Sequence, residues 1–295
     1  MRFLWCVIIV CSMVTVVAQH KKPMATLRQR IDSLVTQTRG SFAVAFKDLQ
    51  SGESLFVNEK QSFHAASTMK TPVMVEIFNQ RQMGRLSLDD SILVRNEFKS
   101  IVDGSSFSLQ ISSDSDDRMY QLIGTNTTVR RLVEVMINVS SNLATNILIE
   151  KVGPENVMRT MKRYGLNDIR VLRGVEDDKA FKEGKNNTTT AYDLALLYTA
   201  LANGSCISRQ ASEEMVEILK TQKFKDMIPS LLPPDVVVAH KTGSITNVQH
   251  DSGIIYLPDG RSYILVILSK DLRSNQEGIN VIAGISKAVY DYMME

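Results

Sequence analysis

The sequence contains few of the residues that build a disulfide framework or a metal centre. Its 295 residues include three cysteines and four histidines, and Cys6 and Cys11 lie in the N-terminal segment described below. If that segment is removed, Cys206 alone remains and no internal disulfide can form. No cysteine or histidine cluster has the spacing of zinc ligands. We therefore expect no metal site and no cofactor, and a core large enough to be stable without cross-links.

An excess of one charge is also absent. The chain carries 34 basic and 32 acidic residues, a formal net charge of +2. This balance gives no reason to expect nucleic acid or an anionic membrane surface as a partner. Hydrophobic residues make up 44% and charged residues 22% of the chain, which is typical of one large globular domain or two closely packed ones. Nothing in the composition requires more than a monomer.

The one long apolar run lies at the N-terminus, from Phe3 to Val17. A single basic residue, Arg2, precedes it and the small Ala18 follows it. This pattern is typical of a secretory signal, and the run is short for a transmembrane span. We predict a signal peptide over residues 1–18, a secreted mature chain and no membrane span after cleavage. An uncleaved anchor is the alternative.

A serine and a lysine lie three residues apart in the stretch from His64 to Pro72. An apolar helix is predicted over Met69–Arg81, and the three-residue spacing places Ser67 and Lys70 on one helical face. A serine hydroxyl is a weak nucleophile until a neighbouring group takes its proton. A lysine in an apolar site can have a pKa low enough to do so. The pair is a candidate nucleophile and base, although this motif alone also arises by chance.

The predicted elements place strands at both ends of the chain and helices between them. Strands from both ends can join one antiparallel five-stranded sheet, covered by the terminal helices, with a helical domain inserted. This is an α/β (α+β) fold. The predicted strands are 41–49, 54–57, 236–244, 249–257 and 262–269, and the terminal helices are 24–39 and 276–294. The predicted division assigns residues 19–66 and 222–295 to the sheet domain and 67–221 to the helical domain, with the active site at the seam.

Three other polar clusters are candidates for the same site. Ser140 and Asn142 interrupt two predicted helices, and Lys241–Gly243 ends a predicted strand. The polar stretch 167–187 contains Glu176. Each cluster has an ordinary alternative: a helix cap, a turn or a solvated surface loop. A loop of about twenty residues in a compact domain is, however, usually functional or disordered.

Taken together, the motifs match a known set. Ser-x-x-Lys at 67–70, Ser-x-Asn at 140–142 and Lys-Thr-Gly at 241–243 follow the order found in serine acylases. On these residues the chain resembles a class A β-lactamase, within the wider family of penicillin-binding proteins, from about Met24 to its end. The resemblance implies a β-lactam as the small-molecule substrate, a role in antibiotic resistance and a periplasmic location.

The resemblance also implies the roles in acylation. Ser67 would attack the β-lactam carbonyl, and the backbone N–H groups of Ser67 and Ser244 would form the oxyanion hole. Lys70 would take or relay the Ser67 proton. Ser140 would pass a proton to the leaving nitrogen. Lys241 would supply positive charge for Ser140 and for the substrate carboxylate.

Further residues would bind the substrate. The hydroxyls of Thr242 and Ser244 could hold its carboxylate, and Asn142 would hold its side-chain amide. Gly243 has no Cβ, so the substrate can approach the strand closely.

Hydrolysis of the acyl-enzyme needs a base, which in class A is a glutamate on the long loop. Glu176 is the candidate for this role. The usual Glu-x-x-x-Asn pattern requires asparagine where this chain has Ala180, and Asp177 and Asp178 are neighbouring alternatives. A purely structural role of Glu176 in the loop is the other interpretation.

Two more positions depart from the family pattern. Ser141 stands where the family usually has an aspartate, which puts local rigidity in doubt more than chemistry. Ser252 stands before Gly-Ile-Ile, where the family often has an arginine. Recognition of the substrate carboxylate would then depend on Lys241, Thr242 and Ser244, or on an arginine elsewhere.

These departures keep three functions open. The first is a secreted β-lactamase that turns over its substrate. The second is a related serine hydrolase that acts on a D-alanyl peptide or an ester. The third is a penicillin-binding module that is acylated and stops, which follows if no loop carboxylate serves deacylation.

Overall fold

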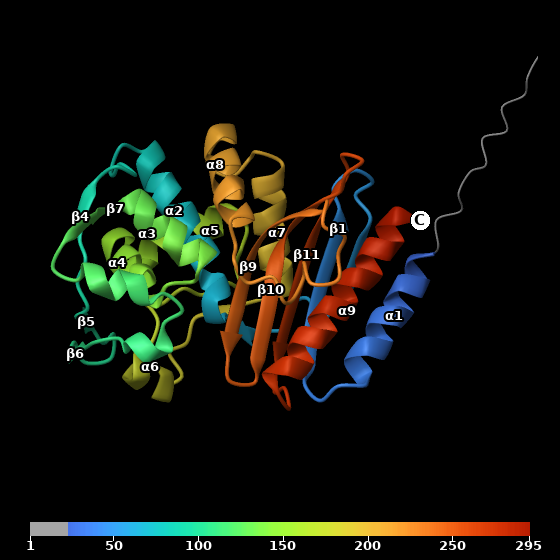
Figure 1. The fold of residues 1–295 in the computed structure, drawn as a ribbon, viewed down its shortest axis with the longest axis horizontal. Coiled ribbons are helices and arrows are strands. Elements are labelled where there is room, and N and C mark those ends of the chain that lie inside the picture. Colours follow the sequence, from blue (N-terminus) through green and yellow to red (C-terminus); the bar gives the residue numbers. More distant parts are fainter. Residues whose placement is uncertain (1–22) are drawn as a thin grey trace, which may run out of the picture.

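The computed structural model describes residues 23–295, so the predicted signal peptide over 1–18 lies outside the described residues. The described chain forms a five-stranded antiparallel sheet with helices on both faces (Figure 1). The strand order β2-β1-β11-β10-β9 brings the first strands of the chain beside the last. This confirms the predicted fold class. The strands are β1 (Ser41–Asp48), β2 (Ser54–Val57), β9 (Val237–Ile245), β10 (Val248–Tyr256) and β11 (Ser262–Lys270).

The side chains of β1 alternate between two hydrophobic cores, as the two-residue period of a strand requires. Phe42, Val44 and Phe46 pack with the terminal helices. Ala43 and Ala45 belong to the core on the opposite face. Figure 1 shows the terminal helices side by side against one face of the sheet. These helices are α1 (Met24–Thr36) and α9 (Asn275–Met294).

The remaining helices lie on the other side of the sheet and beyond it (Figure 1). Helix α2 is buried throughout residues 70–80 and contacts α3, α4 and α5. Helix α7 packs against β1, β10 and β11, and α8 packs against β9. The helices are α2 (Lys70–Gln82), α3 (Val129–Asn138), α4 (Asn142–Val152), α5 (Pro154–Arg163), α6 (Asp178–Lys182), α7 (Ala191–Ala202) and α8 (Arg209–Lys220).

Short elements connect these helices. The polar stretch 167–187, expected to be irregular, contains α6. The stretch 112–117 is rich in serine and aspartate, a composition that favours a solvated loop or a helix start. It runs from one 3₁₀ helix into the next. Three two-stranded ladders pair β3 (Phe63–His64) with β8 (Thr188–Thr189), β4 (Ser91–Leu93) with β7 (Asn126–Thr128), and β5 (Phe98–Lys99) with β6 (Ser106–Phe107). The 3₁₀ helices are η1 (Ala66–Met69), η2 (Ile111–Ser113) and η3 (Asp117–Leu122).

The two cores meet at the sheet. One fills the space under the terminal helices, and the other joins the opposite face of the sheet to the helical region. The division at residues 66/67 and 221/222 stays a prediction. Within residues 23–295, no helix is both long enough and apolar enough to cross a membrane.

Candidate active site

Five of the predicted site residues line a cleft between the helical region and strand β9. Ser67 lies in η1, immediately before α2. Ser140 precedes α4, which begins at Asn142, and Thr242 lies on β9. The cleft has a volume of about 370 Å³, within the range of small-molecule sites. It is lined by Ser67, Ser113, Ser115, Ser140, Asn142, Phe224, Asp226, Met227, Thr242, Ser244, Gln249, Asn275 and Ile279.

Lys70 is the first residue of α2 and is fully buried. Its Nζ donates hydrogen bonds to Ser140 O at 2.7 Å, Ser140 Oγ at 3.0 Å and Asn142 Oδ1 at 2.9 Å. Burial lowers the pKa of Lys70 to about 7, although nearby Asp114 and Glu176 act in the opposite direction. Both protonation states are therefore populated near neutral pH, and the neutral amine can accept a proton.

The amine of Lys70 turns toward the break between α3 and α4. All three of its hydrogen bonds among the described residues go to Ser140 and Asn142, and none goes to Ser67. An ammonium group has three donors, and three acceptor contacts use them all. Proton transfer from Ser67 therefore requires a turn of the lysine side chain or a relay through the Ser140 hydroxyl or a water molecule.

Lys241 approaches the same hydroxyl from the sheet. It is fully buried, and its Nζ donates to Ser140 Oγ at 3.1 Å and to Thr242 O at 2.9 Å. Burial and the neighbouring Lys70 hold the pKa of Lys241 well below its ordinary value, and Asp251 opposes them. The Ser140 hydroxyl thus lies between two lysine amines, a position suited to passing a proton.

A buried His–Asp pair lies beside Lys241 in the sheet. His240 Nδ1 is 2.8 Å from Asp251 Oδ1, and both side chains are almost completely buried. The Asp251 carboxylate also accepts hydrogen bonds from the backbone N–H groups of Ile228 and Ser252. This carboxylate supplies negative charge beneath the lysine on the neighbouring strand.

Glu176 faces the helix break across the cleft. Its Oε1 accepts a hydrogen bond of 2.7 Å from Asn142 Nδ2. Burial raises the pKa of Glu176, the hydrogen bond from Asn142 lowers it, and Asp114 raises it. A carboxylate with a raised pKa is suited to act as a general base near neutral pH. Asn142 therefore joins Glu176 to Lys70.

The loop that carries Glu176 is closed at its neck by Arg173 and Asn187. The Arg173 guanidinium donates to Lys185 O at 3.0 Å, and Asn187 Nδ2 donates to Arg173 O at 2.9 Å. The side chain of Asn146, on α4, forms two hydrogen bonds with the backbone of Val175 and so fixes the residue before Glu176. The loop is therefore anchored on both sides of the glutamate.

The two acids that follow Glu176 have other surroundings. Asp177 accepts hydrogen bonds from Ser100 Oγ, Ile101 N and Ala180 N, so it caps α6 and ties the loop to the β5–β6 hairpin. Asp178 is exposed in the first turn of α6. Ala180 is buried and has no side-chain polar group to hold a water molecule.

Three residues around the cleft have left-handed backbone geometry, which is uncommon outside glycine. Their φ angles are 43° at Ala66, 60° at Ser140 and 61° at Glu176. The amide of Ala66 donates to His64 Nδ1 at 3.0 Å, which supports the turn before Ser67. Strained residues of this kind cluster at active sites.

The end of the cleft near Ser244 carries no arginine among its described lining residues. Gln249, directly opposite on β10, donates from Nε2 to Ser244 Oγ at 2.7 Å. Ser252 is buried, with its Oγ 3.2 Å from Lys241 O and 3.3 Å from Tyr198 Oη. The position that often carries arginine in the family therefore holds a small side chain inside the fold.

Gly243 lies against the turn that carries Ser67. A Cβ at this position would be 3.2 Å from Thr68 Cγ2, 3.3 Å from Ala66 Cβ and 3.3 Å from Ser67 N. Close approach of a substrate to the strand is one reason for a glycine at this position. The structure adds a second reason, which is the close packing of β9 on η1.

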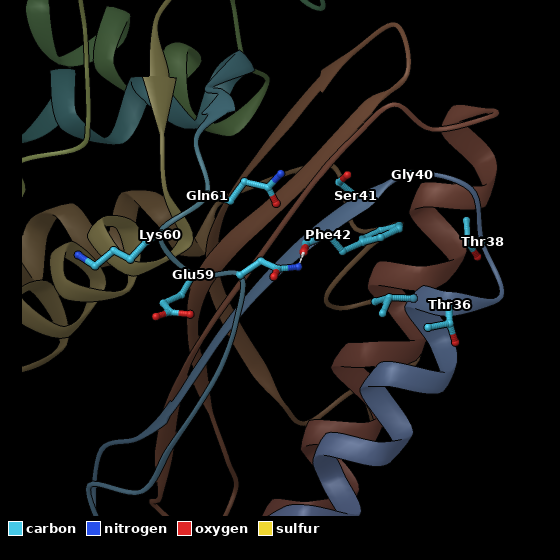
Figure 2. A pocket seen from close by; sticks show the side chains of 10 residues that line it. Thr36, Thr38, Gly40, Ser41, Phe42, Glu59, Lys60 and Gln61 are labelled. Atoms are coloured by element: carbon cyan, nitrogen blue, oxygen red, sulfur yellow. Dashed lines mark hydrogen bonds between the residues drawn. The ribbon is translucent and has the colours of Figure 1, made fainter.

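A larger hollow, of about 770 Å³, lies away from Ser67 at the turn between α1 and β1. Figure 2 shows its walls, where Asn58 Nδ2 donates to Phe42 O at 2.9 Å. Glu59 and Lys60 lie at its edge (Figure 2). None of the predicted site residues is among its lining residues, so its size alone does not make it the candidate site.

Sequence reasoning missed several residues that build the site. None of these residues stands in a recognisable motif. Gln249 bonds Ser244, Asp251 acts on the charge of Lys241, and Asn146 bonds Val175, the neighbour of Glu176. Asp114 fell within a stretch expected to be solvated. Within residues 23–295, no group of three or more His, Cys, Asp or Glu side chains is arranged to hold a metal ion.

The fold and this arrangement of side chains define a serine hydrolase of the class A β-lactamase type. The chain belongs to the β-lactamase enzyme family, whose model matches residues 26–293. A β-lactamase of Bacteroides uniformis is 25% identical over 283 residues, which cover 92% of each chain. The extended-spectrum β-lactamase PER-1 of Pseudomonas aeruginosa is 24% identical, covering 91% of this chain and 88% of its own.

Solved structures share the same fold. The structure of PBP-A is 27% identical with a TM-score of 0.80, covering 93% of this chain and 98% of that one. A 28% identical PBP-A mutant was solved as an acyl-enzyme complex with penicillin G. A β-lactamase of Sphaerobacter thermophilus, at 23% identity and a TM-score of 0.79, supports the fold alone; it covers 93% of this chain and 99% of that one.

Proposed function

We propose that this protein hydrolyses β-lactams through an acyl-enzyme on Ser67. The observation that carries the proposal is the pair of hydrogen bonds that Asn142 makes with Lys70 and Glu176, at 2.9 and 2.7 Å. Through this amide, one continuous network contains a base for each half of the reaction. The names of the relatives, β-lactamases at 24 to 25% identity, point the same way.

Acylation begins when Ser67 Oγ attacks the β-lactam carbonyl carbon. Neutral Lys70 takes the hydroxyl proton, directly or through Ser140. The developing oxyanion receives hydrogen bonds from the backbone N–H groups of Ser67 and Ser244. The C–N bond breaks, and the ring nitrogen takes a proton from Ser140, which is recharged from its lysine neighbours. Ser67 is then an ester.

Deacylation needs one water molecule. The oxygen of that water molecule attacks the ester carbonyl carbon, and Glu176 accepts the proton that the water loses. The ester C–O bond breaks, and Ser67 Oγ recovers a proton, leaving the ring-opened acid. Lys241 and the hydroxyls of Thr242 and Ser244 bind the substrate carboxylate, and Asn142 also contacts the side-chain amide of the substrate.

The cellular role follows from the same proposal. A secreted, periplasmic, monomeric enzyme of this activity would protect its host from β-lactam antibiotics. The motivating features are the N-terminal apolar run and the relatives named β-lactamases.

The decisive experiment measures hydrolysis of a chromogenic cephalosporin by the folded protein and by Ser67→Ala. We expect steady turnover by the wild type and loss of turnover in the variant, with an unchanged circular dichroism spectrum. Absence of turnover by correctly folded wild type would contradict the proposal.

A second function is favoured by one observation, the replacement of the usual loop asparagine by Ala180. A poorly held deacylating water would leave a long-lived acyl-enzyme, as in a penicillin-binding module or a D-alanyl peptidase or esterase. The 27% identity to PBP-A is compatible with this alternative. A stable penicillin adduct on Ser67 in wild type, together with cleavage of a D-alanyl ester, would favour it over the β-lactamase.

A further inference from the structure

Asp114 binds the backbone at the start of α4 from a distant part of the chain. Its Oδ1 and Oδ2 accept hydrogen bonds from Asn142 N at 2.9 and 3.0 Å, and Oδ2 also accepts from Leu143 N at 2.9 Å. The carboxylate is half-buried. The acidic stretch 112–117 therefore contains one residue that turns inward onto the helix that carries the Ser-x-Asn motif.

These contacts complete the N-terminus of α4. The first N–H groups of a helix have no partners within the helix, and a carboxylate there is favoured by the helix dipole. Ser141, the N-cap residue, satisfies only Ala144 N, at 3.3 Å. Asp114 satisfies the two preceding amides, with charge-assisted bonds that are stronger than neutral ones.

The residue fixed in this way is the one whose side chain joins the two predicted bases. Asn142 accepts from Lys70 Nζ and donates to Glu176 Oε1. Its Nδ2 also lies 3.4 Å from Ser113 O, in the segment that leads to Asp114. A shift of the Asn142 backbone would therefore change the geometry of both bases at once.

The charge of Asp114 acts on the same groups. After the effect of burial, Asp114 is the largest influence that raises the pKa of Lys70. Asp114 also raises the pKa of Glu176, although burial and the opposing hydrogen bond from Asn142 have larger effects. It raises the pKa of Tyr120 as well, where only burial has a larger effect. The Asp114 carboxylate also accepts a hydrogen bond from the backbone N–H of Asp116, at 3.2 Å.

We infer that Asp114 is a positioning residue, which fixes the backbone of Asn142 and supplies the negative charge that the usual aspartate at position 141 would otherwise bring to this turn. The inference rests on the proposed function, because it assigns Asp114 a role in that reaction. It explains why serine at position 141 is compatible with an ordered site.

The test compares Asp114→Asn with Asp117→Asn, which removes a charge from an exposed position in the same acidic stretch. Single-turnover reaction with penicillin G, followed by intact-mass spectrometry, gives acylation and deacylation rates. We expect Asp114→Asn to slow acylation by about a hundredfold, the loss expected when reacting groups are misplaced by about 1 Å. Asp117→Asn should match the wild type. Ser141→Asp in an Asp114→Ala background should restore part of the rate.

A second readout does not need a β-lactam. Side-chain carbon NMR titrations follow Lys70 and Glu176, and hydrogen exchange follows the amides of Asn142 and Leu143. Loss of the negative charge should lower the pKa of both side chains and speed exchange of both amides. Asp117→Asn should leave both pKa values and the amide exchange unchanged.

The two readouts separate the possible failures. If the wild type does not react with penicillin G, the proposed function is overturned. If Asp114→Asn nevertheless changes the pKa values and the amide exchange, the placement of Asp114 is supported. Normal rates, or slowed rates with unchanged pKa values and unchanged amide exchange, overturn the inference about Asp114 while the wild-type reaction stands.

Discussion

Asn142 Nδ2 donates a hydrogen bond of 2.7 Å to Glu176 Oε1. The carbonyl oxygen of the same side chain accepts from Lys70 Nζ, so the amide can face the two groups in one orientation only. Among the three acids of the loop, Glu176 therefore contacts a motif side chain, whereas Asp177 bonds Ser100, Ile101 and Ala180 and Asp178 is exposed. The assignment of Glu176 as the base for deacylation can therefore be tested directly by substitution.

Replacing Glu176 by glutamine should separate the two halves of the reaction. Glutamine keeps an oxygen that can accept from Asn142 but cannot take a proton from water. We expect acylation to persist and deacylation to fall by about 10² to 10⁴, the usual contribution of a general base. Intact-mass spectrometry after penicillin treatment should show a lasting adduct on Ser67.

The matched control for this variant is Asp178→Asn, an exposed acid two residues further along the loop. It should release the adduct at the wild-type rate. If Glu176→Gln also deacylates at that rate, the glutamate serves the loop and not the chemistry.

The pH dependence of acylation should report Lys70. Its pKa of about 7 means that the ammonium form dominates below pH 7 and cannot accept the Ser67 proton. We expect the single-turnover acylation rate to rise as pH increases through about 7 and then to level off. A rate already at its plateau at about pH 5 would indicate that Lys70 is not the base.

A methyl group at position 243 should damage the nucleophile turn. The added Cβ of Gly243→Ala would meet Thr68, Ala66 and the Ser67 amide at 3.2 to 3.3 Å. These contacts are tight but not impossible, so we expect a folded protein with slower acylation and a destabilisation of about 1 to 3 kcal/mol. Stopped-flow acylation and urea unfolding measure the two effects.

Gly253→Ala gives a useful contrast on the next strand. Its Cβ would lie 2.4 Å from Ala239 O, a backbone atom that cannot move freely. This variant should lose more stability than Gly243→Ala. Equal acylation rates in Gly243→Ala and wild type would show that the turn adapts and that the close packing has no catalytic consequence.

The sequence allowed prediction of elements whose pattern is local. Alternation in 41–49 identified β1 and the side of the sheet on which Phe42, Val44 and Phe46 lie. Threonines 188–190 followed by an apolar run predict a helix over 191–202, and α7 has these bounds. The helix predicted over 24–39 ends at Thr36, three residues earlier than predicted. Gly40, the predicted stop of this helix, instead ends the turn that leads into β1.

Site contacts between distant segments could not be read in the same way. Asp114 lies 28 residues before Asn142, and its stretch of serines and acids has the composition of a solvated loop. Whether such a carboxylate faces water or a helix end depends on tertiary packing. The sequence motifs indicated the candidate reacting groups, whereas the residues that contact and orient these groups could be identified only in the structure.

The buried His240–Asp251 pair should support both stability and substrate binding. Two backbone N–H groups, of Ile228 and Ser252, point at the Asp251 carboxylate together with His240 Nδ1. Each carboxylate oxygen of Asp251 accepts one of these backbone N–H groups. Asparagine has a single acceptor oxygen, so in Asp251→Asn the NH₂ group would face a buried N–H donor. We expect a loss of about 1 to 3 kcal/mol in the free energy of unfolding, measured with urea.

The same change removes a charge that raises the pKa of Lys241. The amine should become less often protonated, so KM for a carboxylate-bearing β-lactam should rise more than kcat falls. Asp259→Asn is the control, because this acid pairs with Arg261 in an exposed turn, where ion pairs contribute less than about 1 kcal/mol. If both variants unfold at the same urea concentration as wild type, the buried pair has no structural role.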